Sequence, residues 1–160
     1  MSGFLRCVCE GIFKDFRWLD LGEVCSSDLP DVPGVYAIRV AERGMDVKEV
    51  CRGFLSFLEG SKWAELLSYV RSRLARLERI SACPILYIGS APKSIRVRFK
   101  DLSGIRHTAF FPILALMLGG WRLQYGFLTV KSDHEAKELE ERLKSRYAEF
   151  HGSLPALVKK

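Results

Sequence analysis

The stretch PGVYAIRV, residues 33–40, decides the fold, because it is short and combines β-branched with aromatic side chains directly after a turn. The turn spans residues 28–34, where two prolines precede a glycine and prevent a helix or a central strand from continuing. A second stretch of the same character, PILYIG at residues 84–89, is closed by its glycine. Both stretches therefore predict buried strands.

Residues 41–83, between the two strands, predict two helices joined at Gly60-Ser61, with Ser61 as the N-cap of the second. Arg73 and Arg76 lie off the apolar face of this second helix, so we expect it to present cations outward. Its apolar residues recur three and four positions apart and form one buried stripe. The stripe consists of Trp63, Leu66, Leu67, Val70, Leu74 and Leu77.

Two further helices are expected after the second strand. Ser94 to Leu102 predicts a short basic helix that ends near Gly104. Thr108 is the expected cap of an apolar helix over residues 109–118, which two glycines terminate.

A third strand and a last helix complete the expected order. Residues 121–130 alternate and are rich in aromatic side chains, which predicts the strand. Ser132 and Glu135 have the spacing of a capping box, which begins the helix, and the last ten residues are expected to be a tail. The inward stripe of this helix is predicted to be Ala136, Leu139, Leu143, Tyr147 and Phe150.

The length of 160 residues and the 48% hydrophobic content predict a single domain over residues 1–160. Residues 1–30 are an N-terminal extension of that domain, and residues 41–83 are a helical insertion. The first twenty residues mix charged and aromatic side chains, unlike a secretory signal. The longest apolar stretch, residues 109–118, is shorter than the about 20 residues that span a bilayer. We therefore expect an intracellular, cytoplasmic protein without membrane contact.

The composition indicates a thermophilic source, because the chain has no asparagine and a single glutamine while Lys, Arg and Glu are plentiful. In such organisms intracellular disulfides occur. None of the five cysteines forms a Cys-x-x-Cys pair, and the prevailing interpretation is that they are small buried hydrophobic residues. Cys7 and Cys9 would share one face of a strand, which leaves a metal or redox role open. His134 and His151 stand in no such setting, and no pair has the spacing of zinc ligands.

The net charge of +6 is concentrated in one segment. Residues 62–106 hold ten Lys and Arg against three Asp and Glu, while the rest of the chain is nearly balanced. A basic face attracts polyanions and releases counterions when it meets phosphates. This distribution favours a nucleic-acid partner, although a solvated helix face gives a similar pattern.

The order of the motifs resembles the GIY-YIG nuclease family. GVY at residues 34–36 opens one strand, YIG at residues 87–89 ends the next, a basic helix with Arg98 follows, and a helix with Glu140 closes the domain. The resemblance extends from about Asp31 to Lys160, apart from the insertion. It implies an α+β fold with a small central three-stranded antiparallel sheet flanked by helices. The two-helix insertion then lies between the first two strands.

The resemblance also implies an activity, namely a Mg²⁺- or Mn²⁺-dependent endonuclease that hydrolyses phosphodiester bonds in double-stranded or branched DNA. Tyr36 and Tyr87 would be the two motif tyrosines, Arg98 the arginine of the first helix, and Glu140 the metal-binding carboxylate. Arg96 is the alternative to Arg98. His107, just after the basic helix, would contact phosphate or act as a base, or it simply caps the next helix.

These side chains suit phosphodiester hydrolysis on physical grounds. A carboxylate such as Glu140 holds Mg²⁺ with part of its water shell, and Arg98 offers a planar charged fork to a phosphate. A tyrosine hydroxyl relays a proton when a cation lowers its pKa, the role we expect for Tyr36, with Tyr87 hydrogen-bonding phosphate or water. Further contacts with nucleic acid are expected from Arg73, Arg76, Arg96, Lys100 and Arg106.

Two departures from the family pattern keep other interpretations open. The family often carries an asparagine near the C-terminus, and here that position falls on Leu157 or Val158. The connection between the two tyrosines is also much longer than the usual short one. A catalytically weak or inactive DNA-binding module of the same fold is therefore the alternative. A third interpretation is a small α/β interaction protein in which the tyrosines belong to the core.

Overall fold

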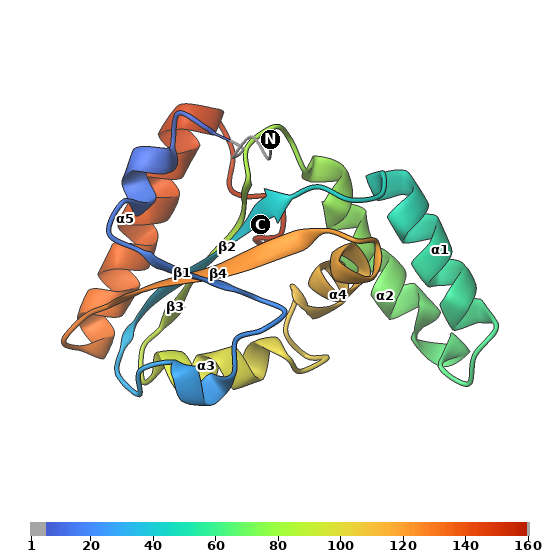
Figure 1. Ribbon diagram of the computed structural model, residues 1–160, viewed down its shortest axis with the longest axis horizontal. Helices are drawn as coiled ribbons and strands as arrows, with labels where there is room; N and C mark the ends of the chain where they lie inside the picture. The colour runs from blue at the N-terminus through green and yellow to red at the C-terminus, as the bar shows by residue number, and fades with distance from the viewer. Residues whose placement is uncertain (1–5, 160) are drawn as a thin grey trace.

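The computed structural model describes residues 6–159, which form one antiparallel sheet enclosed by helices (Figure 1). Five α-helices and four strands are present in this part of the chain. The strands are β1 Arg17–Asp20, β2 Gly34–Glu42, β3 Ile85–Ala91 and β4 Arg122–Thr129. The α-helices are α1 Val47–Glu59, α2 Leu67–Leu74, α3 Ile95–Leu102, α4 Phe110–Leu118 and α5 Asp133–His151. Short 3₁₀ turns are η1 Glu10–Phe13, η2 Ser26–Asp28, η3 Ala64–Leu66 and η4 Ala75–Arg79.

The sheet has four strands in the order β1-β4-β2-β3, so the expectation of three strands was wrong. The additional strand, β1, lies in the N-terminal extension and pairs with β4. Its Trp18 is opposite Gly126, where a Cβ atom would come within 2.5 Å of the indole ring. The Arg39 guanidinium covers the same ring at 3.8 Å. These contacts place a short, partly exposed strand at the sheet edge.

The two sheet faces are covered by different helices, which Figure 1 shows on opposite sides of the strands. Val35 and Ala37 of β2 belong to a cluster with Leu143 and Tyr147 of α5. Tyr36 and Ile38 of β2 belong to a second, larger cluster with residues of α1 to α4. Because successive side chains of a strand point to opposite faces, α5 and α3 lie on different sides of the sheet.

The insertion after β2 contains the two expected helices, although the second is shorter than predicted. Ser61 accepts the backbone N–H of Trp63, but η3 follows and α2 begins only at Leu67. Trp63 is exposed, whereas Val70 and Leu74 are buried as expected. The helices α1, α2 and α4 pack on one another beside the sheet.

The elements after β3 follow the predicted order with local differences. Ser94 caps α3 by accepting the Val97 N–H, and Ser132 caps α5 by accepting the Glu135 N–H. Thr108 does not cap α4, whose N-cap residue is Ala109. Phe150, expected on the inward stripe of α5, is exposed.

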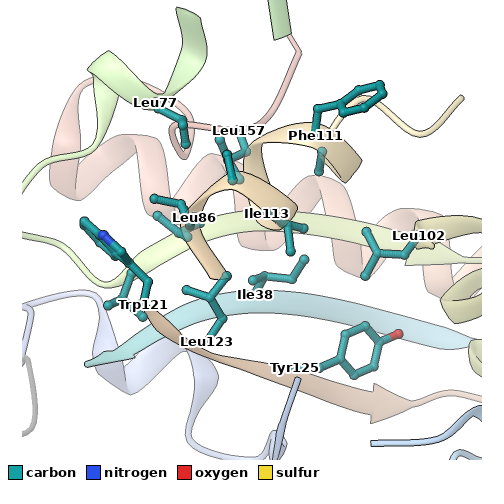
Figure 2. Packing of buried hydrophobic residues seen from close by; sticks show 14 of the residues in the cluster. Ile38, Leu77, Leu86, Leu102, Phe111, Ile113, Trp121, Leu123, Tyr125 and Leu157 are labelled. Carbon is teal, nitrogen blue, oxygen red and sulfur yellow. The ribbon is translucent and has the colours of Figure 1, made fainter. Parts of the chain in front are cut away.

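The tail after α5 is packed rather than free. Ala156, Leu157 and Val158 are buried, and the Leu157 N–H donates to the carbonyl of Leu86 in β3. Figure 2 shows Leu157 in the core together with Leu86 and Leu77. Leu157 thus hydrogen-bonds to the edge strand β3, and its side chain packs in the larger hydrophobic cluster, the one that contains Tyr36 and Ile38. The position where the family often has asparagine is filled here by a core side chain.

Among residues 6–159, no helix combines the length and the apolar character needed to cross a bilayer.

Candidate functional site

Tyr36 lies at the centre of a stack of three tyrosines on the α3 side of the sheet. Its ring centroid is 5.6 Å from that of Tyr87 and 5.6 Å from that of Tyr125, and both pairs are stacked. The side chain is 1% exposed. Register explains the stack, because Ile38 pairs with both Tyr87 and Tyr125, so these rings flank Tyr36 from the neighbouring strands.

One glycine makes room for this stack, and a second makes room for α3 against the sheet. Gly89 pairs with Tyr36, and a Cβ atom there would lie 2.7 Å from Tyr36 Cζ and 2.8 Å from Tyr87 Cε1. At Gly34 a Cβ atom would lie 2.5 Å from Ile95 Cδ1 and still closer to a carbonyl of β4. Both distances are shorter than real Cβ contacts. The glycines of GVY and YIG are therefore needed where strands, rings and α3 approach one another.

His107 is bound through both ring nitrogens. Its Nδ1 accepts the backbone N–H of Ala109 at 3.1 Å, and its Nε2 lies 3.2 Å from Tyr36 Oη. A backbone amide can only donate, so Nδ1 is unprotonated and the neutral ring carries its proton on Nε2. The imidazole therefore donates to Tyr36 Oη. His107 thus binds the backbone at the start of α4, in line with the capping alternative, and its contact with Tyr36 was not predicted.

Burial keeps His107 and Tyr36 neutral. Burial, assisted by the positive charge of Arg98, lowers the pKa of His107 to about 4. The pKa of Tyr36 is raised well above its ordinary value, first by burial and then by Tyr87, and Arg98 opposes this only in part. The expectation that an arginine lowers the tyrosine pKa is therefore not met. At neutral pH Tyr36 is a hydrogen-bond donor and not a base.

A pocket of about 600 Å³ opens beside the cluster. Tyr87, Arg98 and His107 line it together with Lys100, Arg106 and Thr108. Asp101 is the single carboxylate among the lining residues, and its Oδ2 lies 3.6 Å from Arg98 Nη1. The wall of the pocket therefore carries more positive than negative charge, and it suits an anion.

Three arginines near this pocket hold buried nitrogens for which the described chain offers no acceptor. These atoms are Arg98 Nε, Arg73 Nε and Arg76 Nη1. Burial and the charge of Arg73 lower the pKa of Arg76, while Tyr87 and Tyr69 oppose this, so Arg76 lies near the tyrosines. Buried polar groups are nearly always hydrogen-bonded in folded proteins. The Arg98 side chain is 41% exposed, so its remaining N–H donors can reach an external acceptor such as a phosphate oxygen.

The insertion contributes directly to the site, because α2 reaches the loop before α4. The Tyr69 hydroxyl of α2 donates to the carbonyl of Ile105 at 3.0 Å, and the guanidinium of Arg73 lies 4.4 Å from the centroid of the Tyr69 ring. Arg73 and Arg76 are therefore half-buried, although the sequence predicted them to point into solvent. Tertiary contact with the loop accounts for the difference.

The remaining basic residues divide between structural and open positions. Arg96 Nε donates to the carbonyl of Leu29 at 3.0 Å, so Arg96 fastens α3 to the preceding loop. Arg98, one half-turn further, faces the tyrosines instead. Lys100 and Arg106 are exposed at the pocket.

Glu140 lies on α5 and thus on the helix that covers the other face of the sheet. Its Oε1 is 2.6 Å from Lys144 Nζ, and both side chains are mostly buried. Among residues 6–159, Glu140 forms no hydrogen bond or ion pair with Tyr36 or Arg98. The structure therefore brings together four of the five expected catalytic residues, and Glu140 is held by a lysine.

A divalent ion does not fit Glu140 in this arrangement. Mg²⁺ takes oxygen ligands, usually one or two carboxylates with several waters. The Lys144 ammonium binds one oxygen of this carboxylate, Oε1, and no group of three or more metal-ligand side chains among residues 6–159 includes Glu140. Asp101, the carboxylate in the pocket, faces Arg98. We therefore derive no chemical step through a metal ion here.

Tyr125 is part of the site although the sequence did not single it out. The Tyr125 ring stacks on the Tyr36 ring, and the Phe99 ring of α3 lies edge-on to it with 5.0 Å between the ring centroids. The Tyr125 hydroxyl is buried and has no hydrogen-bond partner among the described residues. The sequence did contain a signal for Tyr125, because side chains alternate between the two faces along β4 and Tyr125 therefore shares a face with Leu123 and Phe127. Only the strand order shows that this face adjoins Tyr36.

Comparisons of the chain with protein-family models, with curated proteins and with solved structures each found no match.

Proposed function

We propose that this protein is a nuclease of the GIY-YIG type, which binds nucleic acid through its basic pocket and hydrolyses phosphodiester bonds there. The observation that carries the proposal is the set of buried arginine nitrogens around the tyrosine cluster. Arg98, Arg73 and Arg76 each hold one buried nitrogen without an acceptor in the described residues, and Arg98 also lines the pocket. The motif order of the sequence and the glycine that admits the tyrosine stack support the same assignment.

The residues of the cluster have separate tasks in this proposal. Arg98 binds a non-bridging phosphate oxygen and offsets the charge that develops on it. Neutral His107 donates to Tyr36 Oη and fixes the direction of the tyrosine hydroxyl. Tyr36 keeps its proton at neutral pH and, because it is 1% exposed, supports the site from behind, while Tyr87 lines the pocket and hydrogen-bonds phosphate or water. Arg73 and Arg76 hold the neighbouring phosphates along the strand.

A divalent-ion requirement is included in the proposal because the motif resemblance implies it. Glu140 is the family's ligand position, but here it lies on α5, across the sheet from the pocket, and is paired with Lys144. The requirement therefore rests on the resemblance alone.

Binding without cleavage is the second candidate function. The Glu140–Lys144 contact favours it, as does the position of the family's asparagine, because both candidates for it, Leu157 and Val158, are buried apolar side chains. Such a protein would use the same basic pocket to recruit duplex or branched DNA.

Plasmid nicking together with fluorescence anisotropy tests both candidates. Wild type, Arg98→Ala and Arg122→Ala are mixed with supercoiled, linear and branched DNA, with and without Mg²⁺ or Mn²⁺. We expect nicking by wild type and Arg122→Ala, and loss of nicking with Arg98→Ala. Arg122 is a suitable control because it is exposed and pairs with Asp20 and Glu42 at the far end of β4.

The outcomes separate the candidates. Salt-dependent binding without nicking of any substrate supports the binding module and contradicts the nuclease. Nicking that Arg98→Ala leaves unchanged assigns the activity to a contaminant or to another site. If neither binding nor nicking occurs at low salt, both candidates are wrong.

A further inference from the structure

A group of three cysteines and one histidine lies on the face of the sheet opposite the pocket. Cys7 and Cys9 precede η1, Cys83 precedes β3, and His151 ends α5. Three segments that are far apart in sequence thus place their sulfur and nitrogen atoms in one cluster. All four ligand atoms lie within 4.8 Å of one another.

The distances within this cluster match a tetrahedral metal site. Cys9 Sγ is 3.5 Å from Cys83 Sγ, and Cys7 Sγ is 3.4 Å from His151 Nε2. With metal–sulfur bonds of about 2.3 Å, the sulfurs of a tetrahedral zinc site are about 3.8 Å apart. The upper bound of 4.8 Å for the ligand-atom separations exceeds this spacing by about 1 Å, so small side-chain adjustments would bring the four atoms onto one ion.

The local backbone holds these ligands in place. The Cys7 carbonyl accepts the Glu10 N–H, and the Cys9 carbonyl accepts the Ile12 N–H, both at 3.0 Å. Cys9 and Cys83 are buried, whereas Cys7 and His151 are partly exposed, so an ion has a route from solvent. A preorganised set of this kind takes an ion without refolding of the chain.

The ligand types select the ion. Thiolates and one imidazole favour zinc and other thiophilic ions over Mg²⁺ or Mn²⁺, which take oxygen ligands. Three thiolates and a neutral imidazole around Zn²⁺ leave one negative charge. Arg39 lines a pocket with Cys7 and Cys9, and Arg79 lines one with Cys83 and His151, so cations lie on both sides.

We propose that Cys7, Cys9, Cys83 and His151 bind a structural Zn²⁺ ion that fastens the N-terminal extension and the end of α5 to the start of β3. With all four positions filled by protein ligands, the ion has no open site for substrate. The site is distinct from any divalent ion used in phosphodiester hydrolysis. It also revises the sequence-based interpretation, which found no zinc-ligand spacing and gave His151 no role.

Metal analysis of the full-length protein tests this proposal without an activity assay. The full-length protein is purified under reducing conditions and reconstituted with Zn²⁺. The bound metal is then measured by inductively coupled plasma mass spectrometry. We expect about one zinc per chain in wild type and a loss of zinc affinity of at least about tenfold in His151→Ala. His151→Cys should restore binding, because a fourth thiolate replaces the imidazole.

Cys25→Ser is the matched control, because Cys25 is exposed and lies outside the cluster. It should bind zinc like wild type, and a chelator should lower the melting temperature of both by about 10 °C. Cobalt-substituted protein should show the visible bands of tetrahedral thiolate coordination. A wild type that binds no zinc, equal loss in Cys25→Ser and His151→Ala, or a Cys9–Cys83 disulfide found in the reduced preparation would overturn the proposal.

Discussion

The imidazole of His107 links the start of α4 to the hydroxyl of Tyr36, with Nδ1 accepting the Ala109 N–H and Nε2 lying 3.2 Å from Tyr36 Oη. This double contact determines the tautomer of the ring, and so determines that the histidine donates to the tyrosine. The loop that lines the pocket and the central strand are thereby joined through one side chain. Changes at His107 should therefore affect the stability of the fold and the site together.

The lowered pKa of His107 predicts a loss of stability in weak acid. The folded ring has a pKa of about 4, while the unfolded ring has the ordinary value of 6.5. Between these values the unfolded chain binds more protons, so the free energy of unfolding falls as the pH drops from 6.5 toward 4. Denaturant titrations at pH 7, 6 and 5 measure the fall.

Two variants isolate the contribution of His107. His107→Asn keeps an acceptor near the place of Nδ1 but does not titrate. The free energy of unfolding should therefore depend less on pH in this variant. His134→Asn should leave it unchanged, because His134 is 80% exposed. A ring that titrates near 6.5 by NMR would show that the described burial is wrong.

Arg98 should contribute to nucleic-acid binding and to turnover. Removal of one donor that stabilises developing charge costs about 100-fold in rate, which we expect for Arg98→Ala. The slope of log affinity against log salt should also fall by about 1, because one phosphate contact is lost. Arg98→Lys keeps the charge without the planar fork, so it should recover binding better than rate. An unchanged salt slope would place Arg98 outside the interface.

Gly89 should be intolerant of a side chain because of the tyrosine stack. A Cβ atom there would meet Tyr36 Cζ at 2.7 Å and Tyr36 Oη at 2.8 Å, and the buried Tyr36 ring has little room to move. Overpacking of this kind costs about 1–3 kcal/mol, and each kcal/mol lowers the melting temperature of a domain of this size by about 2–4 °C. Calorimetry of Gly89→Ala measures the shift.

Gly53→Ala is the matched control for this substitution. A Cβ atom at Gly53, inside α1, meets nothing within 4 Å. Alanine should therefore raise the melting temperature slightly, since it favours the helix by about 0.5–1 kcal/mol. Equal effects of the two substitutions would contradict the packing described for Tyr36.

Much of the fold followed from local sequence patterns, because buried strands and amphipathic helices leave periodic signals. The pattern failed at β1, where four residues, RWLD, have only half-buried side chains. Trp18 belongs to the sheet because Gly126 leaves room for its ring. No local signal carries that information, because it depends on how β1 and β4 pair.

The site was predictable where residues lie on the strands of the motifs and less so elsewhere. Tyr36 and Tyr87 were placed by their strands, and Arg98 by the resemblance of the basic helix to the family pattern, with Arg96 as the alternative. The tautomer of His107 and the partial burial of Arg73 depend on contacts between separate elements. The Cys7–His151 contact joins the two ends of the chain, so spacing in the sequence does not reveal it.

The ion pair between Glu140 and Lys144 gives a test of the metal requirement that follows from the proposed function. Lys144 Nζ lies 2.6 Å from Glu140 Oε1, so a metal ion must displace it from the carboxylate. Lys144→Met removes the competitor and should lower the Mg²⁺ concentration for half-maximal nicking by about two- to fivefold, since such pairs contribute on the order of 1 kcal/mol. Lys137→Met removes an exposed lysine of the same helix and should have no effect. A Mg²⁺ requirement equal in both variants, or full nicking by Glu140→Gln, would show that Glu140 is not the metal ligand.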